Sequence, residues 1–152
     1  MSGWLNKVRN NVGNIVNAIS YYETQIEEAK KELSLRGSVE KHSRDMPGVV
    51  EYRFYQLQEI EAILEYLNIE HRKLRSKEFR KFLEHYNRQL SSRDAEKYVD
   101  GVDSVVDMQH VINEFSLVRN QMQGIIKSLD QKSFSISNII KLRAAGLEDI
   151  EL

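Results

Sequence analysis

Apolar residues recur near the start of the chain at alternating steps of three and four. They are Leu5, Val8, Val12, Ile15, Ile19, Tyr22, Ile26, Ala29 and Leu33. This spacing is the 3.5-residue repeat of a coiled-coil seam, so it predicts a heptad helix over residues 1–36. Such a seam needs a partner helix, which either the same chain or another subunit supplies. Gly37 and the Pro47–Gly48 pair predict a connector over residues 37–48.

A second helix is predicted over residues 49–90, where the same spacing returns. Its first apolar set is Leu57, Ile60, Leu64, Leu67, His71 and Leu74. Its second set is Phe79, Phe82, Leu83, Tyr86 and Leu90. The two sets are out of register, which rotates the apolar seam around the helix axis. We expect His71 to be a satisfied core or interface histidine rather than a metal ligand.

Further helices are predicted over residues 102–146, with Ser104 and Asp107 as capping residues for the first of them. One apolar row has the seam spacing and comprises Val105, Met108, Ile112, Phe115, Met122, Ile126 and Leu129. A second row, of Val111, Val118 and Ile125, lies beside it. Two rows predict contacts on two sides, as in a central helix or at an oligomer interface. A compact terminal helix is predicted after Ser133, ending at Gly146.

Composition places the chain in the all-α class, as one domain of long amphipathic helices. It has 152 residues, of which 30% are charged, and a single proline, which is typical of long helices rather than sheets. The expected protomer is an antiparallel coiled coil or bundle, and the unpaired seams favour a homo-oligomer. The absence of cysteine fits a cytoplasmic protein. Neither a signal peptide nor a membrane span is expected.

Charge is distributed unevenly along the chain. The segment Ile69–Arg93 holds eight positive and three negative residues, a net charge of +5 in a protein whose total is −1. Residues 94–114 then carry a net charge of −5. At 100° per residue, one broad face of the basic helix presents Lys73, Lys77, Arg80, Lys81 and Arg88. The aromatic residues Phe82 and Tyr86 are interleaved with these cations.

The basic face has two interpretations. It is either the solvated surface of a bundle helix or an anion-binding stripe. We favour the stripe, because only Glu84 interrupts it and no i,i+4 pattern of acids neutralises it. Cations that neutralise phosphates release condensed counterions, and aromatic rings stack on unpaired bases, so the stripe suits a nucleic-acid strand. Several copies in a ring would strengthen the weak grip of one helix.

Catalytic and metal-binding motifs are missing from the sequence. The seven glycines are scattered singly and form no phosphate-binding loop, and there is no cysteine. The four histidines are His42, His71, His85 and His110. None of them belongs to an HxxxH, HExxH or ExxH pattern. We therefore expect neither an enzyme nor a bound metal or cofactor.

The C-terminal segment 98–146 resembles the oligomerisation region of the UvsY-type recombination mediators of T4-like phages. An acidic patch leads into a long amphipathic helix, which continues through Ile125, Ile126 and Lys127 to a polar turn with Lys132. The basic segment matches a basic helix of that family through Lys77, Arg80, Lys81, Phe82, Tyr86 and Arg88. Overall the likeness covers about residues 50–146.

The resemblance implies a non-enzymatic, ring-shaped homo-oligomer that binds single-stranded DNA. Proteins of that family help a RecA-like recombinase replace the single-stranded-DNA-binding protein during DNA recombination and repair. The implied location is the cytoplasm of an infected host cell. The implied oligomerisation residues are Ile112, Phe115, Met122, Ile126, Leu129, Phe134, Ile136 and Ile140.

A second hypothesis needs only the heptad pattern. The chain would then be a coiled-coil structural or adaptor protein, for example a phage virion or assembly component, with no nucleic-acid role. Substitution of the basic face separates the two hypotheses, because only the first makes DNA binding depend on it.

Overall fold

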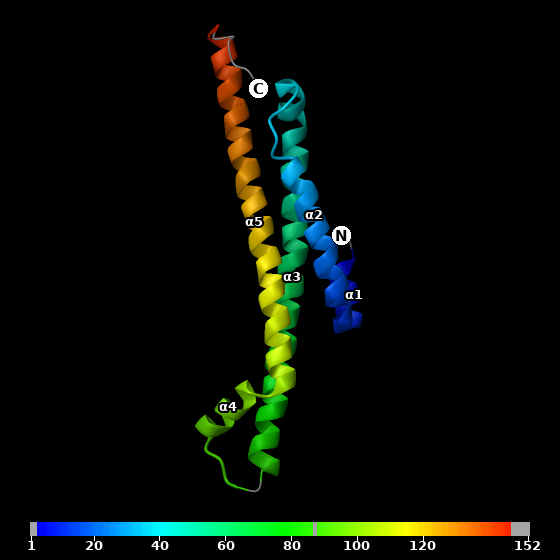
Figure 1. Ribbon diagram of the computed structural model, residues 1–152, viewed down its shortest axis with the longest axis vertical. Coiled ribbons are helices and arrows are strands. Elements are labelled where there is room, and N and C mark those ends of the chain that lie inside the picture. The colour runs from blue at the N-terminus through cyan, green and yellow to red at the C-terminus, as the bar shows by residue number, and fades with distance from the viewer. Residues whose placement is uncertain (1–2, 87, 147–152) are drawn as a thin grey trace.

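The computed structural model describes residues 3–86 and 88–146, which are almost entirely helical (Figure 1). In order along the chain, its elements are α1 (Trp4–Asn10), the 3-10 turn η1 (Val12–Asn14), α2 (Ile15–Lys31), α3 (Val39–His85), α4 (Ser92–Asp100) and α5 (Asp103–Ala144). No strand occurs among these described residues. The all-α class predicted from the sequence is confirmed.

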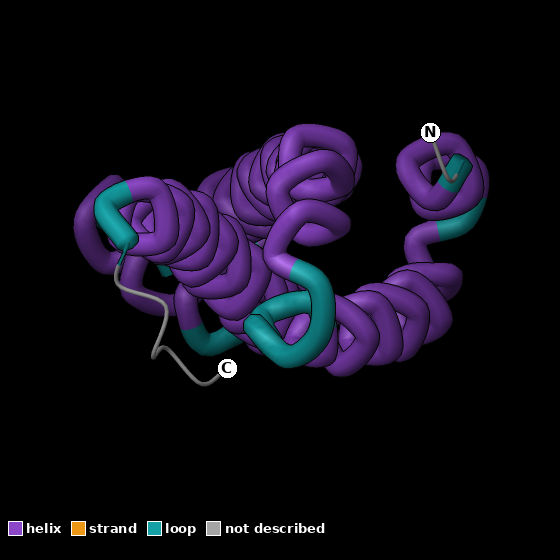
Figure 2. The backbone as a smooth tube through the Cα atoms, turned by 90° about the horizontal axis from the view of Figure 1, so that it is seen from above, coloured by secondary structure: helices purple, strands orange, loops and turns teal. Residues whose placement is uncertain are grey.

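Two long helices form the body of the molecule. Helix α3 has 47 residues and α5 has 42, and they lie side by side in antiparallel directions (Figure 1). Helix α2 lies against the first half of α3, and α4 folds back at the other end of α3 (Figure 1). Seen from above, the described chain consists of helices joined by short loops (Figure 2).

The apolar seam of the N-terminal heptad segment packs against other helices of the same chain. Its buried residues face α3 and α5 and belong to one continuous core. The predicted single helix is, however, broken. At Asn11 the backbone is extended (φ −153°, ψ 111°), and the Asn11 side chain accepts a hydrogen bond from the N–H of Gly13. Asparagine competes with the helix in this way because its short side chain bonds the neighbouring backbone.

The predicted connector over residues 37–48 is wrong in its second half. Helix α3 begins at Val39, where Ser38 Oγ accepts the N–H of Lys41 as an N-cap, and Pro47 lies inside the helix. Proline removes one helical hydrogen bond at a cost of about 3 kcal/mol. Burial of Val39 and Met46 in the core offsets this cost. The helix also ends earlier than predicted, at His85 rather than residue 90.

Helix α4 was not predicted, although its start carries a recognisable signal. Ser91 Oγ accepts the N–H of Asp94 and donates to Asp94 Oδ2, which is a reciprocal N-terminal cap. Helix α5 also differs from the prediction. It starts after Val102, without a side-chain cap from Ser104, and it passes through Ser133 without a break.

Most residues of both apolar rows of α5 are buried, and Met108, Val111 and Ile126 are half-buried. Phe115, Met122 and Leu129 of the first row and Val118 and Ile125 of the second belong to the core shared with α2 and α3. The two-sided contact predicted for this helix is therefore confirmed, and it is made inside one chain.

Aromatic contacts join the N-terminal helices to α5. The Tyr22 and Phe115 rings meet edge to face at 6.1 Å, and Tyr21 links Tyr22 to Trp4 of α1. The Tyr22 hydroxyl donates to Glu59 of α3, so the buried ring is also fixed by a hydrogen bond. This chain of contacts explains why α1 keeps its place after the break at Asn11.

A buried arginine ties α2 to α3. The side chain of Arg53 is 2% exposed, and its Nη2 and Nε donate to the two carboxylate oxygens of Glu32 at 2.6 and 3.0 Å. Its Nη1 donates to the side-chain oxygens of Gln25 and Gln56. Each of the three guanidinium nitrogens thus donates a hydrogen bond. Such pairing allows a charged group to be buried without a large cost in free energy.

A buried lysine ties α5 to the turn between α2 and α3. Lys132 Nζ donates to the Glu32 carbonyl oxygen at 2.6 Å and lies 3.2 Å from His42 Nδ1, while His42 Nε2 lies 2.8 Å from the Arg36 carbonyl oxygen. Burial lowers the pKa of Lys132 below its ordinary value, because the charged form loses solvation.

Replacement of Glu32 by Gln should lower the free energy of unfolding by about 3 kcal/mol, because Arg53 then stays buried without its carboxylate. The measurement is equilibrium unfolding in urea. The matched control is Glu27→Gln, which removes an exposed pair with Lys30 and should cost less than about 0.5 kcal/mol. Equal effects of the two substitutions would contradict the structural role of Arg53.

Lys132 predicts a pH dependence of stability. Because its pKa is lowered in the folded chain, the unfolded chain binds the proton more tightly as the pH approaches the ordinary value of 10.5. The free energy of unfolding of the native chain, relative to a Lys132→Met variant, should therefore rise between pH 8 and pH 10.5, by the linkage of proton binding to folding. Urea unfolding of both proteins at pH 8 and at pH 10.5 gives this difference in the free energy of unfolding. A difference that falls as the pH rises would contradict the burial of Lys132.

Candidate nucleic-acid interface

The basic segment of α3 begins where the core ends. Leu67 is the last residue of α3 that is fully buried. Beyond it the helix continues for 18 residues to His85 with only partial cover, supplied by α4 and the start of α5. The cations of this segment are therefore presented on a rigid helix that extends past the packed bundle.

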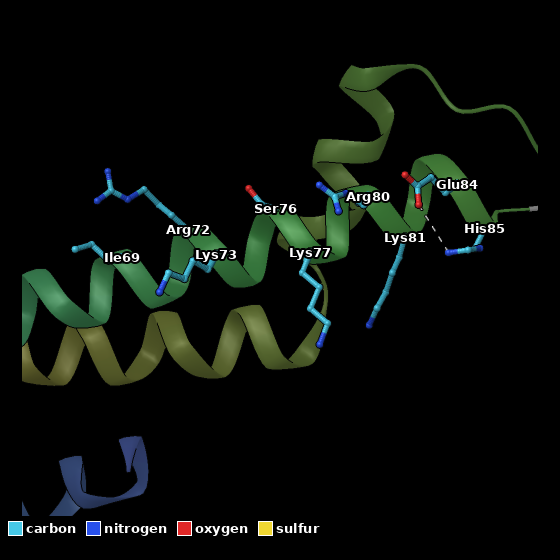
Figure 3. Close-up of a pocket in the computed structure, with 9 residues that line it drawn as sticks. All are labelled: Ile69, Arg72, Lys73, Ser76, Lys77, Arg80, Lys81, Glu84 and His85. Atoms are coloured by element: carbon cyan, nitrogen blue, oxygen red, sulfur yellow. Dashed lines mark ion pairs between the residues drawn. The ribbon is translucent and has the colours of Figure 1, made fainter. Parts of the chain in front are cut away.

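One face of this extension forms a shallow groove of about 630 Å³, which we call the basic groove (Figure 3). Its lining comprises Ile69, Arg72, Lys73, Ser76, Lys77, Arg80, Lys81, Glu84 and His85. Five of these side chains are permanently cationic and one is a carboxylate. The positive charge predicted from the sequence is thus gathered on one surface.

Most of the predicted cations lie in the basic groove, with one addition and one exception. Lys73, Lys77, Arg80 and Lys81 line it, and Arg72 joins them. Arg72 could have been found from the sequence, because residues 72, 76, 80 and 84 form a single i,i+4 row. Arg88 lies beyond the end of α3 and does not line the groove.

Acids three residues earlier neutralise part of the charge, at an i,i+3 spacing that the expectation about i,i+4 pairs did not cover. Lys73 Nζ lies 2.8 Å from Glu70, and Lys81 Nζ lies 2.9 Å from Glu78. The hydrogen bond from Lys73 to Glu70 raises the pKa of Lys73 above its ordinary value. A third pair, with an exposed arginine, joins Arg72 to Glu65 at 3.5 Å.

Lys77 and Arg80 differ from the other three cations of the basic groove in their ion pairing. Neither forms an ion pair with any residue in the described part of the chain, whereas Arg72, Lys73 and Lys81 all do. Both side chains are exposed. An incoming phosphate would meet these two without first displacing an acid.

The predicted aromatic residues do not line the basic groove. Phe82 and Tyr86 instead pack with Tyr98 of α4, and these three rings form what we call the aromatic cluster. The Phe82 and Tyr98 rings are stacked at 5.6 Å, and Tyr86 lies 6.0 to 6.1 Å from both. Tyr98 was missed in the sequence because α4 was missed. The rings contact one another, so their evident role is to hold α4 against α3.

A second groove runs between α3 and α4, and we call it the α3–α4 groove. It measures about 650 Å³, and its lining comprises Arg72, Arg75, Ser76, Phe79, Arg80, Leu83, Glu84, Glu96 and Val99. At one end Arg75 Nη2 forms an ion pair with Asp100 at 2.9 Å. Part of the acidic segment, residues 94–114, therefore contacts the basic helix of its own chain.

The residues implied as oligomerisation contacts fall into two groups. Ile112, Phe115, Met122, Leu129 and Ile136 are buried in the core of the single chain, and Ile126 is half-buried against it. Only two of the implied residues, Phe134 and Ile140, are exposed. Because the first group already packs inside the protomer, it is not free to contact another subunit in this conformation.

His71 differs from expectation in one detail. It lies half-buried on α3, but its Nε2 is buried and has no hydrogen-bond partner among the described residues. It is therefore not the fully satisfied core histidine that was expected.

Replacement of Tyr98 by Ala should loosen α4, which is too short to be stable alone. Removal of its interactions with two rings costs about 1 kcal/mol, so amide hydrogens of α4 should exchange roughly fivefold faster. Hydrogen exchange read by mass spectrometry measures this. Tyr55→Ala, which changes an exposed tyrosine elsewhere on α3, is the control and should leave α4 unchanged. An unchanged exchange rate in the Tyr98 variant would refute the anchoring role.

Other kinds of site are not found in residues 3–86 and 88–146. No three His, Asp or Glu side chains in these ranges are grouped as metal ligands would be. Nor is any helix within them both long and apolar enough to cross a membrane. The chain matches no protein-family model, no curated protein and no solved structure.

Proposed function

We propose that this protein is a non-enzymatic recombination mediator that binds single-stranded DNA. In this role it helps load a RecA-like recombinase in exchange with the single-stranded-DNA-binding protein. The basic groove is the observation that carries the DNA-binding part. The mediator role and the two protein partners rest on the resemblance of residues 50–146 to the UvsY-type family.

The dimensions and charges of the basic groove fit a phosphate backbone. From Arg72 to Lys81 the helix rises about 14 Å at 1.5 Å per residue, so the row meets several phosphates of one strand. Each neutralised phosphate releases counterions, and log K for a single strand falls with log salt by about 0.7 per phosphate. Five neutralised phosphates give only weak binding at physiological salt.

Assembly into a homo-oligomer would strengthen this weak binding through effective concentration. Exposed apolar side chains in the last third of α5 are available for contacts between subunits. They are Phe134, Ile140 and Leu142, of which Phe134 is 65% exposed. We propose a ring of subunits joined through this part of α5.

The alternative role is that of a coiled-coil structural or adaptor protein, such as a virion or assembly component. The length of α3 and α5 favours it, because long paired helices serve as spacers. The five cations of the basic groove favour the DNA-binding proposal instead, since a spacer has no need of them.

Simultaneous replacement of Lys77, Arg80 and Lys81 by Ala tests the proposal. Because each subunit then neutralises three fewer phosphates, the slope of log K against log salt should become smaller by about 2, and affinity at 0.1 M salt should fall on the order of 100-fold. Fluorescence anisotropy with a labelled single-stranded oligonucleotide gives both quantities.

The matched control replaces Lys30, Lys31 and Lys41, which are three exposed lysines at the other end of the molecule. This control removes the same number of positive charges as the basic-groove variant. It should leave the slope of log K against log salt nearly unchanged. Equal losses of affinity in both variants, or a flat salt response of the native chain, would refute the proposal. Intact assembly of the basic-groove variant with no DNA binding by the native chain would favour the structural role.

A further inference from the structure

The α3–α4 groove differs chemically from the basic groove beside it. Phe79 and Leu83 of α3 and Val99 of α4 add three apolar side chains to its charged lining, whereas Ile69 is the one apolar side chain that lines the basic groove. Leu83 is 46% exposed and Phe79 is half-buried, so these two side chains supply the accessible apolar surface. A volume of about 650 Å³ lies within the range of sites that bind small, flat, mainly apolar ligands.

The two grooves are continuous. Arg72, Ser76, Arg80 and Glu84 line both of them, and these residues form one i,i+4 row along α3. The row is therefore a ridge with the cationic surface on one side and the α3–α4 groove on the other. A strand whose phosphates lie along the cations would have its bases within reach of the second groove.

Polar groups of the α3–α4 groove can contact base edges. Arg75 lines the groove with a side chain that is 43% exposed, and its Nη2 is paired with Asp100. Glu96 supplies a carboxylate acceptor from the α4 side. An apolar surface flanked by an arginine and a carboxylate can stack on a base and accept or donate at its edge.

We propose that the α3–α4 groove receives unpaired nucleobases of the strand whose backbone lies in the basic groove. This inference rests on the DNA-binding function proposed above and assigns the preference for single strands to Leu83 and Phe79, behind which Val99 is buried. A duplex keeps its bases paired and stacked, so its bases cannot enter the groove without breaking base-pair steps at about 1.4 kcal/mol each. A single strand has no such cost.

The aromatic cluster is the other candidate for base stacking, and the geometry disfavours it. Phe82, Tyr86 and Tyr98 pack on one another, with Tyr86 47% and Tyr98 51% exposed, but they lie outside the two grooves. They therefore position α4, and α4 in turn forms one wall of the base site.

The test compares an oligo-dT strand with an abasic strand of the same length, because both carry the same phosphates. The native protein should bind oligo-dT about tenfold more tightly than the abasic strand. A Leu83→Ser variant, which changes no charge and no residue of the basic groove, should lose most of this preference while the salt slope stays the same. Leu83→Tyr should retain it, because a ring restores a stacking surface.

Leu117→Ser is the control, since Leu117 is an exposed leucine on α5, and it should retain the preference. Circular dichroism checks that each variant is folded. Equal binding of the two strands by the native protein would overturn the base site while leaving the DNA-binding proposal intact. A preference unaffected by Leu83→Ser would overturn its assignment to this groove. Failure of the native protein to bind either strand would refute both proposals.

Discussion

The two apolar rows of α5 require partners along its length, and α3 and α2 together supply them. Phe115, Met122 and Leu129 are completely buried in this contact, and each buried side chain of this kind contributes about 1.5–3 kcal/mol. Because α5 contacts both helices, the apolar seam of the N-terminal segment is buried inside the chain. The antiparallel pairing also brings Lys132 onto the turn after α2, 100 residues away in sequence.

The basic segment is exposed because the core does not extend that far along α3. Full burial of α3 ends at Leu67, yet the helix continues because its hydrogen bonds are local and its start is fixed by packing. Many side chains of the extension are charged, so the main core does not continue along it. A rigid helix that projects cations beyond a folded bundle is well suited to hold an extended polyanion.

Helix α4 converts that simple charged helix into a surface with two grooves. It is held by Ala95 and Val99, by the aromatic cluster and by the Arg75–Asp100 ion pair. Asp100 of α4 thus pairs with Arg75 on one flank of the basic helix, while Lys77 and Arg80 form no ion pair with any described residue. The proposed separation of phosphates from bases follows from this asymmetry, with Arg72 and Arg80 on the ridge between them.

The sequence alone determined the helical class, the buried rows of α5 and most cations of the basic groove, because helical periodicity and charge are local properties. Tertiary packing decided the rest. Pro47 lies inside α3 because Val39 and Met46 are buried beside it. The row containing Phe115 and Met122 packs into the core of the single chain, because α2 folds back onto it. Phe82 and Tyr86 face Tyr98 instead of the cations, since only the folded chain places α4 there.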